Sequence, residues 1–447
     1  MSATGPATNH AATNHAATNH AAADHAAADR CPGVLRLAVA ADGYLARVRL
    51  PGGLIGAGQL RVLARLASEL GDGRVELTSR GNAQLRGLAP EAAGPLTDQL
   101  ARAGLFPSPE HDLVRNVLAS PLAGLDGGPD LTAIVRALDA ALCARARLAG
   151  LPGRFLFAVD DGRGDVAGLG ADVIARVRAD VAMVNGLAVP GAARDHAGTD
   201  HAAAADVVTV MLACAEAFLD LRATEGGTAW RIADLPGGAE RVRSAVAARL
   251  GLAAGPRPPA APPVPVGSGG TGAPDGTAPP TAPDGTGETA PPTAPDGTGE
   301  TALPIAPAGR PVGVVGTAAV LLAPLGRLTA AQLTWVADRV GGRPARITPW
   351  RSVVVPDLPD AAGVIREAAG LGFGVDAGSP WLRVTACAGR PGCASALADV
   401  QADAAAFAAR WPERIVHVSG CARHCGRPAA TQVDVTATSE GYQVAGL

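Results

Sequence analysis

With 447 residues, the chain is long enough for two to four domains with a sizeable hydrophobic core. Its formal net charge is −3, which excludes the strongly positive field that attracts nucleic acid. The N-terminus lacks the basic start and apolar core of a secretion signal, and no run of about 18 apolar residues occurs. The sequence therefore predicts a soluble, cytoplasmic protein without a membrane segment.

Residues 1–30 repeat a five-residue unit that contains His10, His15, His20 and His25. Histidines spaced by five residues do not share one face of a helix, so metal binding is the weaker of two interpretations. We expect a disordered, low-complexity tail.

Residues 34–105 form the first expected unit. The stretch LRLAVAADGYLARVRLPGG alternates apolar and polar residues across an Asp-Gly turn, which predicts a hairpin. Residues 59–70 have helical spacing, with leucines on one face. RVELTSRGNAQLRGL then reads as a strand, and the β-α-β pattern predicts a ferredoxin-like half domain.

Residues 111–250 predict an α/β domain, with a helix near residues 131–149 and a strand in LPGRFLFAVDDG. Asp195-His196 and Asp200-His201 lie in an alanine-rich stretch with the five-residue period of the N-terminus. Iron ligation by these pairs is conceivable, but replicated sequence is the simpler interpretation.

Residues 254–308 predict an extended linker, because a segment so rich in Pro, Gly and Thr cannot bury a core. Within it, TAPDGTGETAPP and TAPDGTGETALP are tandem copies. After the linker the earlier pattern restarts. Residues 331–351 resemble residues 58–80, and LRVTACAGRPGC resembles LVRNVLASPLAG.

This similarity indicates an internal duplication. We expect a second ferredoxin-like half domain at residues 310–378 and a second α/β domain at residues 380–447. The first α/β domain is a degenerate copy, because it has Ala119 and Ser120 near the expected first cysteine pair and LPGRFLFAVD in place of SGCARHC. The predicted fold is α+β, with two half domains and two α/β domains around a pseudo-two-fold cleft, where ligands commonly bind.

Four of the seven cysteines form two close pairs near the C-terminus: Cys387, Cys393, Cys421 and Cys425. Glycines flank them, and four thiolates on two short loops are typical of an iron–sulfur cluster. Structural zinc usually takes pairs spaced by two to four residues, so the five-residue gap disfavours it. Disulfides and four unrelated buried thiols are further alternatives. Cys31, Cys143 and Cys214 stand apart as ordinary thiols.

The spacing C-x5-C followed by SGC-x3-C resembles the cluster signature of the sulfite/nitrite reductase superfamily. In that superfamily a sirohaem, a tetrapyrrole with many carboxylates, lies beside a [4Fe–4S] cluster, and one cysteine bridges the two. The resemblance implies that Cys425 is the bridging ligand. It also implies that Arg80, Arg115 and Arg154 contact the tetrapyrrole or an oxyanion.

Arginines are the residues best suited to a polycarboxylate ligand, because a guanidinium grips a carboxylate with two hydrogen bonds. Each alone is more often a surface charge, but several lie at the ends of expected elements in both copies. The candidates for binding tetrapyrrole carboxylates are Arg80, Arg86, Arg115, Arg154 and Arg351.

This chain departs from the reductase pattern at one position that bears on the kind of substrate it binds. Reductases of this superfamily carry a K-F-K type pattern where this chain has Arg154-Phe155-Leu156, so the second basic residue is replaced by an apolar one. Reduction of a small oxyanion needs concentrated positive charge at that point. Sirohaem-dependent sulfite or nitrite reduction is therefore the alternative, and a non-catalytic electron carrier is a third possibility.

Within the superfamily, the chain resembles the precorrin-3B synthase family in DGYLARVRLPGG, LTSRGNAQLRGL, LPGRFLFAVDDG, ITPWRSVVVP and SGCARHCG. That resemblance implies a monooxygenase of cobalamin biosynthesis that oxidises precorrin-3A with O2 and forms a γ-lactone. It implies a [4Fe–4S] cluster, an electron donor as partner and a further mononuclear non-haem iron. His424 and His111 are candidate ligands of that iron, although hydrogen-bonding roles are more common for histidines so placed.

Overall fold

The computed structural model describes residues 31–178, 181–189, 201–252 and 311–446. The expected tail at residues 1–30, the expected linker at residues 254–308, and the stretch with Asp195, His196 and Asp200 lie outside the described residues. None of the helices in the described part is both long and apolar enough to cross a membrane.

The first half domain builds a five-stranded sheet, which we call sheet A, in the order β1-β2-β5-β4-β13. Its strands are β1 (Ala38–Ala40), β2 (Gly43–Val48), β4 (Arg74–Leu77), β5 (Ala83–Leu88) and β13 (Arg327–Thr329). The expected hairpin is confirmed by β1 and β2, which pair antiparallel across residues 41 and 42. The stretch read as one strand is instead the hairpin β4–β5, because the backbone reverses at Gly81 with φ of 65°.

Helices α2 (Ala57–Leu70) and α3 (Ala93–Arg102) belong to this half domain, with short 3-10 turns η1 (Pro51–Gly53) and η2 (Pro90–Ala92). As the spacing predicted, Leu60, Leu63 and Leu66 of α2 are buried. They pack in a core that contains residues from both half domains.

The second half domain repeats this arrangement in sheet B, with the order β11-β12-β15-β14-β3. Its strands are β11 (Gly313–Val315), β12 (Ala318–Leu322), β14 (Ala345–Ile347), β15 (Ser352–Val355) and β3 (Leu54–Ile55). Helices α7 (Ala330–Ala337) and α8 (Ala361–Gly370) and turn η5 (Pro324–Gly326) accompany them. The two half domains exchange edge strands: β13 from the second copy completes sheet A, and β3 from the first completes sheet B. The half domains are thus one body with a shared core.

The two copies also share unusual backbone geometry, which supports the duplication. Gly52 of η1 has φ of 63° and Leu325 of η5 has φ of 54°. In the two hairpin turns, Gly81 has φ of 65° and Arg351 has φ of 62°. Left-handed backbone is unfavourable for residues with a side chain, so its retention at Leu325 and Arg351 shows that the surrounding fold dictates it.

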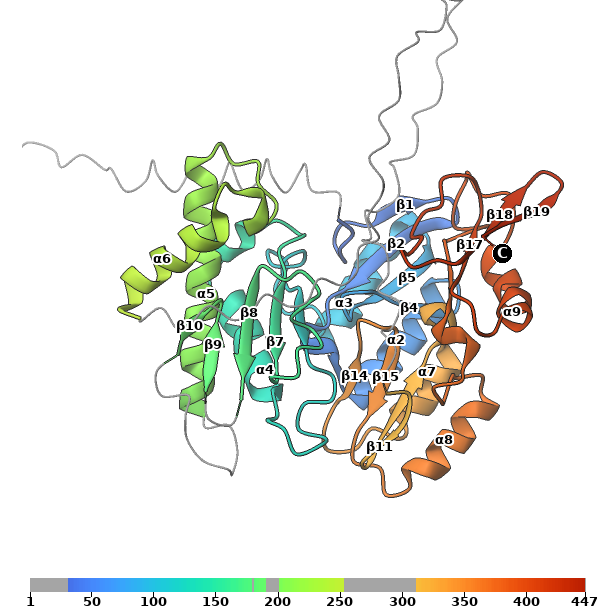
Figure 1. The fold of residues 1–447 in the computed structure, drawn as a ribbon, viewed down its shortest axis with the longest axis horizontal. Coiled ribbons are helices and arrows are strands. Elements are labelled where there is room, and N and C mark those ends of the chain that lie inside the picture. The colour runs from blue at the N-terminus through green and yellow to red at the C-terminus, as the bar shows by residue number, and fades with distance from the viewer. Residues whose placement is uncertain (1–30, 179–180, 190–200, 253–310, 447) are drawn as a thin grey trace, which may run out of the picture.

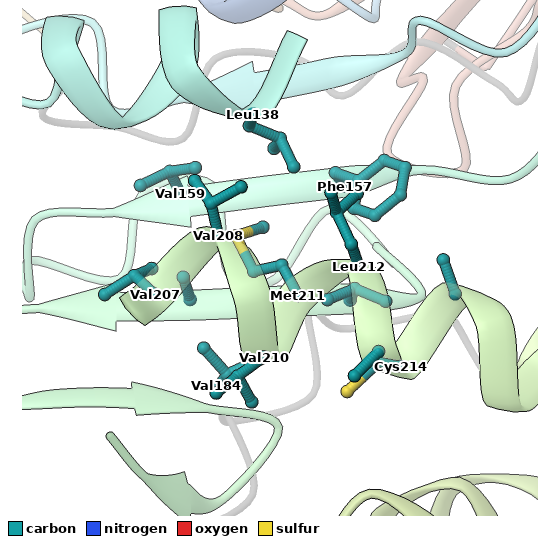
Figure 2. Packing of buried hydrophobic residues seen from close by; sticks show 14 of the residues in the cluster. Leu138, Phe157, Val159, Val184, Val207, Val208, Val210, Met211, Leu212 and Cys214 are labelled. Carbon is teal, nitrogen blue, oxygen red and sulfur yellow. The ribbon is translucent and has the colours of Figure 1, made fainter. Parts of the chain in front are cut away.

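The first α/β domain contains sheet C, ordered β10-β9-β8-β7-β6, with β6, β7 and β8 parallel. Its strands are β6 (Val117–Ala119), β7 (Phe157–Asp160), β8 (Val173–Val177), β9 (Ala182–Val184) and β10 (Leu187–Ala188). The other elements are α4 (Thr132–Cys143), α5 (His201–Thr224), α6 (Gly238–Leu250), η3 (Ala146–Gly150) and η4 (Ile232–Asp234). Figure 2 shows Leu138, Phe157, Met211 and Cys214 packed in the core between helix and sheet. Cys214 is a fully buried core thiol, as expected.

The C-terminal α/β domain is a smaller version built on sheet D, ordered β16-β17-β18-β19. It comprises η6 (Pro380–Leu382), β16 (Val384–Ala386), α9 (Val400–Arg410), β17 (Val416–Ser419), β18 (Val433–Thr438) and β19 (Gly441–Ala445). Strands β16, β17 and β18 are parallel, as are β6, β7 and β8. In Figure 1 the first α/β domain is green and the C-terminal one red, with the blue and orange half domains between them.

Strand register corrects one detail of the expected duplication. Ala119 pairs with Val159 as Ala386 pairs with Val418, so β7 is the counterpart of β17. LPGRFLFAVD therefore contains the strand itself. The segment that corresponds to SGCARHC begins at Asp160.

Candidate functional site

The two cysteine pairs meet at one edge of sheet D. Cys387 follows β16 directly, and Cys421 comes two residues after β17. Because these strands are adjacent and parallel, both loops leave the sheet at the same edge. The thiol of Cys387 interacts electrostatically with Cys393 and Cys425, and Cys425 interacts with Cys421 and Cys393. The two loops therefore place the four thiols close enough for their charges to affect one another.

Backbone N–H groups are directed at this group of thiols. The N–H of Gly420 donates to Sγ of Cys387 at 3.1 Å. Burial, above all, raises the pKa of the Cys387 thiol, and the neighbouring thiols add to this, whereas the N–H groups of Gly420 and Gly389 oppose it. A Cβ at Gly420 would meet Ala396 at 2.7 Å, so this close approach requires glycine.

These features fit an iron–sulfur cluster. Its cationic irons would stabilise the neighbouring thiolates, and N–H groups directed at sulfur are typical partners of cluster ligands. In the described parts of the chain, no three His, Cys, Asp or Glu side chains converge so as to hold a single metal ion.

Arg86 lies beside the cysteine loop and is engaged by the chain itself. Its guanidinium forms two hydrogen bonds of 3.1 Å with Asp42 and one of 3.0 Å with the carbonyl oxygen of Gly392. Burial acts to lower the pKa of Arg86, but the hydrogen bonds with Asp42 and the charge of Glu76 raise it overall. This residue contacts the cysteine loop, where the sequence suggested a substrate contact.

Arg115 is likewise engaged. Both edges of its guanidinium contact Asp139 of α4 at 2.7 Å, and Nη1 donates to the carbonyl oxygen of Leu105. The Arg115 side chain is 4% exposed. Such a buried bidentate pair fixes α4 against the segment before β6.

Arg80 and Arg154 lie near each other. Nη1 of Arg80 donates to the carbonyl oxygen of Gly153, the residue before Arg154. The exposed Arg154 lies over the ring of Trp230, with Cζ 5.4 Å from the ring centroid. These two candidates therefore belong to one region.

Further arginines, which the sequence analysis did not single out, surround Arg80. Burial lowers the pKa of Arg80, and Arg231 and Arg47 lower it further by charge repulsion. Burial, together with Arg47 and Arg80, lowers the pKa of Arg49 to about 9. We call these four residues the arginine cluster: Arg47, Arg49, Arg80 and Arg231. The spacing of Arg47 and Arg49 by two residues is visible in the sequence ARVR at the end of β2, but the approach of Arg231 depends on the fold.

The arginine cluster carries more positive than negative charge. Its carboxylate neighbours are Asp112 and Asp172, and Nε of Arg231 contacts Asp172 at 2.6 Å. Nε of Arg47 and Nε of Arg49 are buried without a hydrogen-bond partner in the part of the chain that the structure describes. Like-charged, desolvated guanidinium groups are costly to hold together, which is typical of a site for an anionic ligand.

Arg351 occupies the hairpin turn of sheet B. It stands in the position of Gly81, and its Nη1 donates to the carbonyl oxygen of Leu325 at 3.0 Å. The counterpart of Arg80 is therefore Trp350. The arginines in the two copies are not at equivalent positions, contrary to the expectation from sequence.

A cavity of about 320 Å³ lies between η1, α4 and the segment before β14. Arg49, Arg115, Arg136 and Asp139 line it, together with mainly apolar residues. Of the five arginines proposed from sequence, only Arg115 lines this cavity, and none of the four paired cysteines does.

The two candidate histidine ligands have hydrogen-bonding environments. His111 is buried between Ser108 and the carbonyl oxygen of Arg145, at 2.7 and 3.1 Å. His424 lies 3.4 Å from Oγ of Ser419 and 3.8 Å from Asp434. His417 is fully buried beneath this loop, and burial lowers its pKa to about 4.

Comparison with known proteins identifies the fold family. Residues 39–103 match the nitrite/sulfite reductase ferredoxin-like half domain. The whole arrangement resembles the structure of NirA from Mycobacterium tuberculosis, with a TM-score of 0.59, 20% identity, and coverage of 90% of this chain and 74% of that one. The chain therefore contains a nitrite/sulfite reductase ferredoxin-like half domain within a fold similar to that of NirA.

The relatives identified by sequence differ in extent. Ferredoxin–nitrite reductase from Synechococcus elongatus is 33% identical over 139 residues, which cover 29% of this chain and 27% of the relative. The corresponding enzyme from Leptolyngbya laminosa is 37% identical over 99 residues, or 22% of this chain and 19% of the relative. The match thus spans only about a quarter and a fifth of these reductases. Precorrin-3B synthase from Sinorhizobium sp is 27% identical over 431 residues, covering 92% of this chain and 81% of the relative. Along nearly its whole length, this chain is similar to precorrin-3B synthase.

Proposed function

We propose that the chain is an oxidoreductase that carries out the precorrin-3B synthase reaction on a tetrapyrrole with a [4Fe–4S] cluster. Similarity over 92% of the chain to a precorrin-3B synthase is the observation that carries the proposal. The four gathered thiols support the cluster, with Cys387, Cys393, Cys421 and Cys425 as ligands. When bound, such a cluster would supply electrons one at a time, as activation of O2 requires.

The arginine cluster, together with Arg154, would hold the carboxylates of the tetrapyrrole. Arg80 and Arg154 are the two sequence-based candidates that lie in this region, and Arg47 and Arg231 add charge beside them. A polycarboxylate ligand would offset the mutual repulsion of these guanidinium groups. Because Arg86 and Arg115 are already paired with Asp42 and Asp139, we assign the carboxylates to the arginine cluster and Arg154.

The proposed reaction transfers one oxygen atom of O2 to precorrin-3A. The other oxygen atom leaves as water and takes up two electrons and two protons, so an external electron donor is needed. The arginine cluster would fix the macrocycle so that one carbon faces the oxidant, since orientation is the main contribution a rigid site makes. Closure of the γ-lactone then uses a carboxylate of the substrate itself.

The environment of Leu156 supports a substrate other than a small oxyanion. Leu156 is 3% exposed and packs with Leu118, Val166 and Trp350. Its N–H donates to Asp172 at 2.9 Å. A buried apolar residue at this position supplies none of the positive charge that reduction of sulfite or nitrite requires.

The test is to incubate anaerobically purified protein with precorrin-3A and a reductant and then admit O2. We expect a product heavier by one oxygen atom, with the label present when ¹⁸O₂ is used. Unchanged precorrin-3A in a sample that contains a full complement of iron and sulfide would refute the proposal.

A second candidate function is sirohaem-dependent nitrite or sulfite reduction, favoured by the local identity to ferredoxin–nitrite reductases. The two functions differ in the purified protein. A reductase would show the intense visible bands of sirohaem, whereas the proposed synthase would show only the broad absorption of a cluster.

A further inference from the structure

Sheet A has one polar face, and this face is directed at the cysteine loop of residues 387–393. Nη2 of Arg47 donates to Gln84 at 2.9 Å, and Gln84 donates to Glu76 at 2.8 Å. Farther along the same face, Arg86 and Arg327 extend to the C-terminal domain. These two arginines come from different copies, because β13 carries Arg327 into sheet A by strand exchange.

Each of the two arginines reaches one end of the cysteine loop. Arg86 donates directly to the carbonyl oxygen of Gly392, the residue before Cys393. Arg327 donates to Gln401 at 2.6 Å, and Gln401 donates to the carbonyl oxygen of Cys387 at 3.2 Å. Each guanidinium is oriented by a carboxylate in a turn next to sheet A: Asp42 between β1 and β2 for Arg86, and Asp72 before β4 for Arg327.

The copy without the cysteine pairs has a matching arrangement. Arg346 of β14 donates to the carbonyl oxygens of Pro121 and Ala123, both at 2.7 Å, and is 3% exposed. Arg343 donates to the carbonyl oxygen of Gly124 at 2.9 Å. In both copies, arginines of the half domain therefore hold the loop after the first strand of an α/β domain. Since the strand positions of the arginines differ, the arrangement is not explained by duplication of the same residues.

We propose that Arg86 and Arg327 are positioning residues that clamp the cysteine loop to sheet A and thereby fix the cluster relative to the arginine cluster. This inference rests on the proposed function for the cluster, but the clamp itself is defined by protein contacts. Sheet A also carries the turn with Arg80, so a loop held on this sheet keeps a defined separation between the two sites. A charge-assisted hydrogen bond to a carbonyl is strong enough for this role.

The first test is hydrogen exchange on the full chain, which reports the clamp whether or not a cluster is bound. In Arg86→Gln, the amide of Cys393, bonded to Gly389 at 2.8 Å, should exchange roughly tenfold faster. The amide of Ala123, bonded to Ser120 at 3.2 Å, should keep its wild-type rate. Arg346→Gln is the matched control and should give the reverse pattern.

The clamp would be refuted if Arg86→Gln left the Cys393 amide at its wild-type rate, or if both variants loosened both loops equally. Should Arg86→Gln fail to fold, Gln401→Ala removes the Arg327 arm alone and should accelerate exchange in the segment around Cys387.

The second test uses the spectrum of the cluster. The double variant Arg86→Gln/Asp42→Asn removes the Arg86 arm of the clamp without changing net charge. An altered electron paramagnetic resonance signal of the reduced cluster would therefore report position rather than charge. An unchanged signal would contradict the clamp. If the purified wild-type protein contained no iron and sulfide, the proposed cluster would be refuted. The exchange experiment would still decide whether the clamp exists.

Discussion

The two α/β domains share the arrangement of their parallel strands and differ in the side chains on the loops that follow those strands. In the C-terminal copy, the loops after β16 and β17 carry the four paired cysteines at one edge of sheet D. In the first copy, Ser120 stands where Cys387 stands, and its hydroxyl donates to Asp165 at 2.6 Å. The loop also places Leu122 and Leu125 against Ala318, Val320 and Val354 of sheet B. In the first copy, side chains of the chain itself therefore fill the space that corresponds to the cysteine loops.

The comparison teaches that duplication preserved the backbone while the chemistry diverged in the loops. The direction of the first three strands is the same in both α/β domains, and two left-handed positions recur in both half domains. The face of sheet A that meets the cysteine loop carries Gln84 and Glu76. The face of sheet B that meets the loop of the first copy is mainly apolar, with Arg346 buried in it. A core is constrained by packing, whereas a loop tolerates substitution once its backbone groups are satisfied.

We expect the largest effect when one of the paired cysteines is replaced, because these cysteines are the main chemical difference between the two α/β domains. Cys421→Ser should abolish the broad cluster absorption and with it the O2-dependent conversion of precorrin-3A, because it removes one of the four thiolates proposed to hold the cluster. The matched control is Cys214→Ser, a fully buried thiol outside the pairs, which should keep the absorption. Turnover retained by Cys421→Ser would remove the cluster from the reaction.

The next largest effect concerns the stability of the fold, at the contact between the two half domains where Gly53 approaches Ile347. Gly53 has φ of 69°, and a Cβ there would run into the carbonyl oxygen of Ile347. We expect Gly53→Ala to lower the free energy of unfolding by about 3 kcal/mol or more. Gly341→Ala, where a Cβ meets nothing within 4 Å, is the control and should leave the denaturation midpoint nearly unchanged.

The difference in ligand binding is tested at Arg80. Arg80→Gln should weaken tetrapyrrole binding by roughly ten- to a hundredfold, the usual loss for one charge-assisted contact. Isothermal titration under anaerobic conditions measures it. Arg241→Gln, which removes an exposed ion pair with Glu225, is the control. Equal affinity in wild type and Arg80→Gln would place the carboxylates elsewhere.

The smallest expected effect concerns how stability depends on pH at two aspartates of the first α/β domain, Asp165 and Asp126. Burial raises the pKa of Asp165 despite its hydrogen bond from Ser120, so folding favours the protonated form. Its contribution to stability is then greatest below the ordinary pKa of an aspartate and is lost as pH rises through the raised value. Asp165→Asn should therefore stabilise the protein at pH 7, within about 1 kcal/mol, with a gain that disappears in acid.

Asp126 should behave in the opposite sense. The hydrogen bond from Arg163 lowers its pKa, so its contribution is present above the ordinary pKa and lost as pH falls through the lowered value. Asp126→Asn should slightly destabilise the protein at pH 7. Unfolding curves at several pH values measure both variants, and a change of the same sign in both would contradict the assignment.

The sequence by itself determined the local elements and the position of the paired cysteines in one of the two copies. Helix α2 follows from the spacing of its leucines, and the hairpin β1–β2 from alternation across a turn. The paired cysteines with their glycines identified which of the two copies could hold a cluster. These features are encoded by residues near one another in the chain, where periodicity and spacing suffice.

Only the tertiary structure decided which arginines face one another. It paired Arg86 with Asp42 and the cysteine loop, paired Arg115 with Asp139, and brought Arg231 to Arg80 across 151 positions of sequence. It also exchanged β3 and β13 between the sheets. The sequence around an arginine does not show whether its side chain binds a substrate or pairs with a carboxylate of its own chain. Only the packing of distant segments distinguishes these two roles.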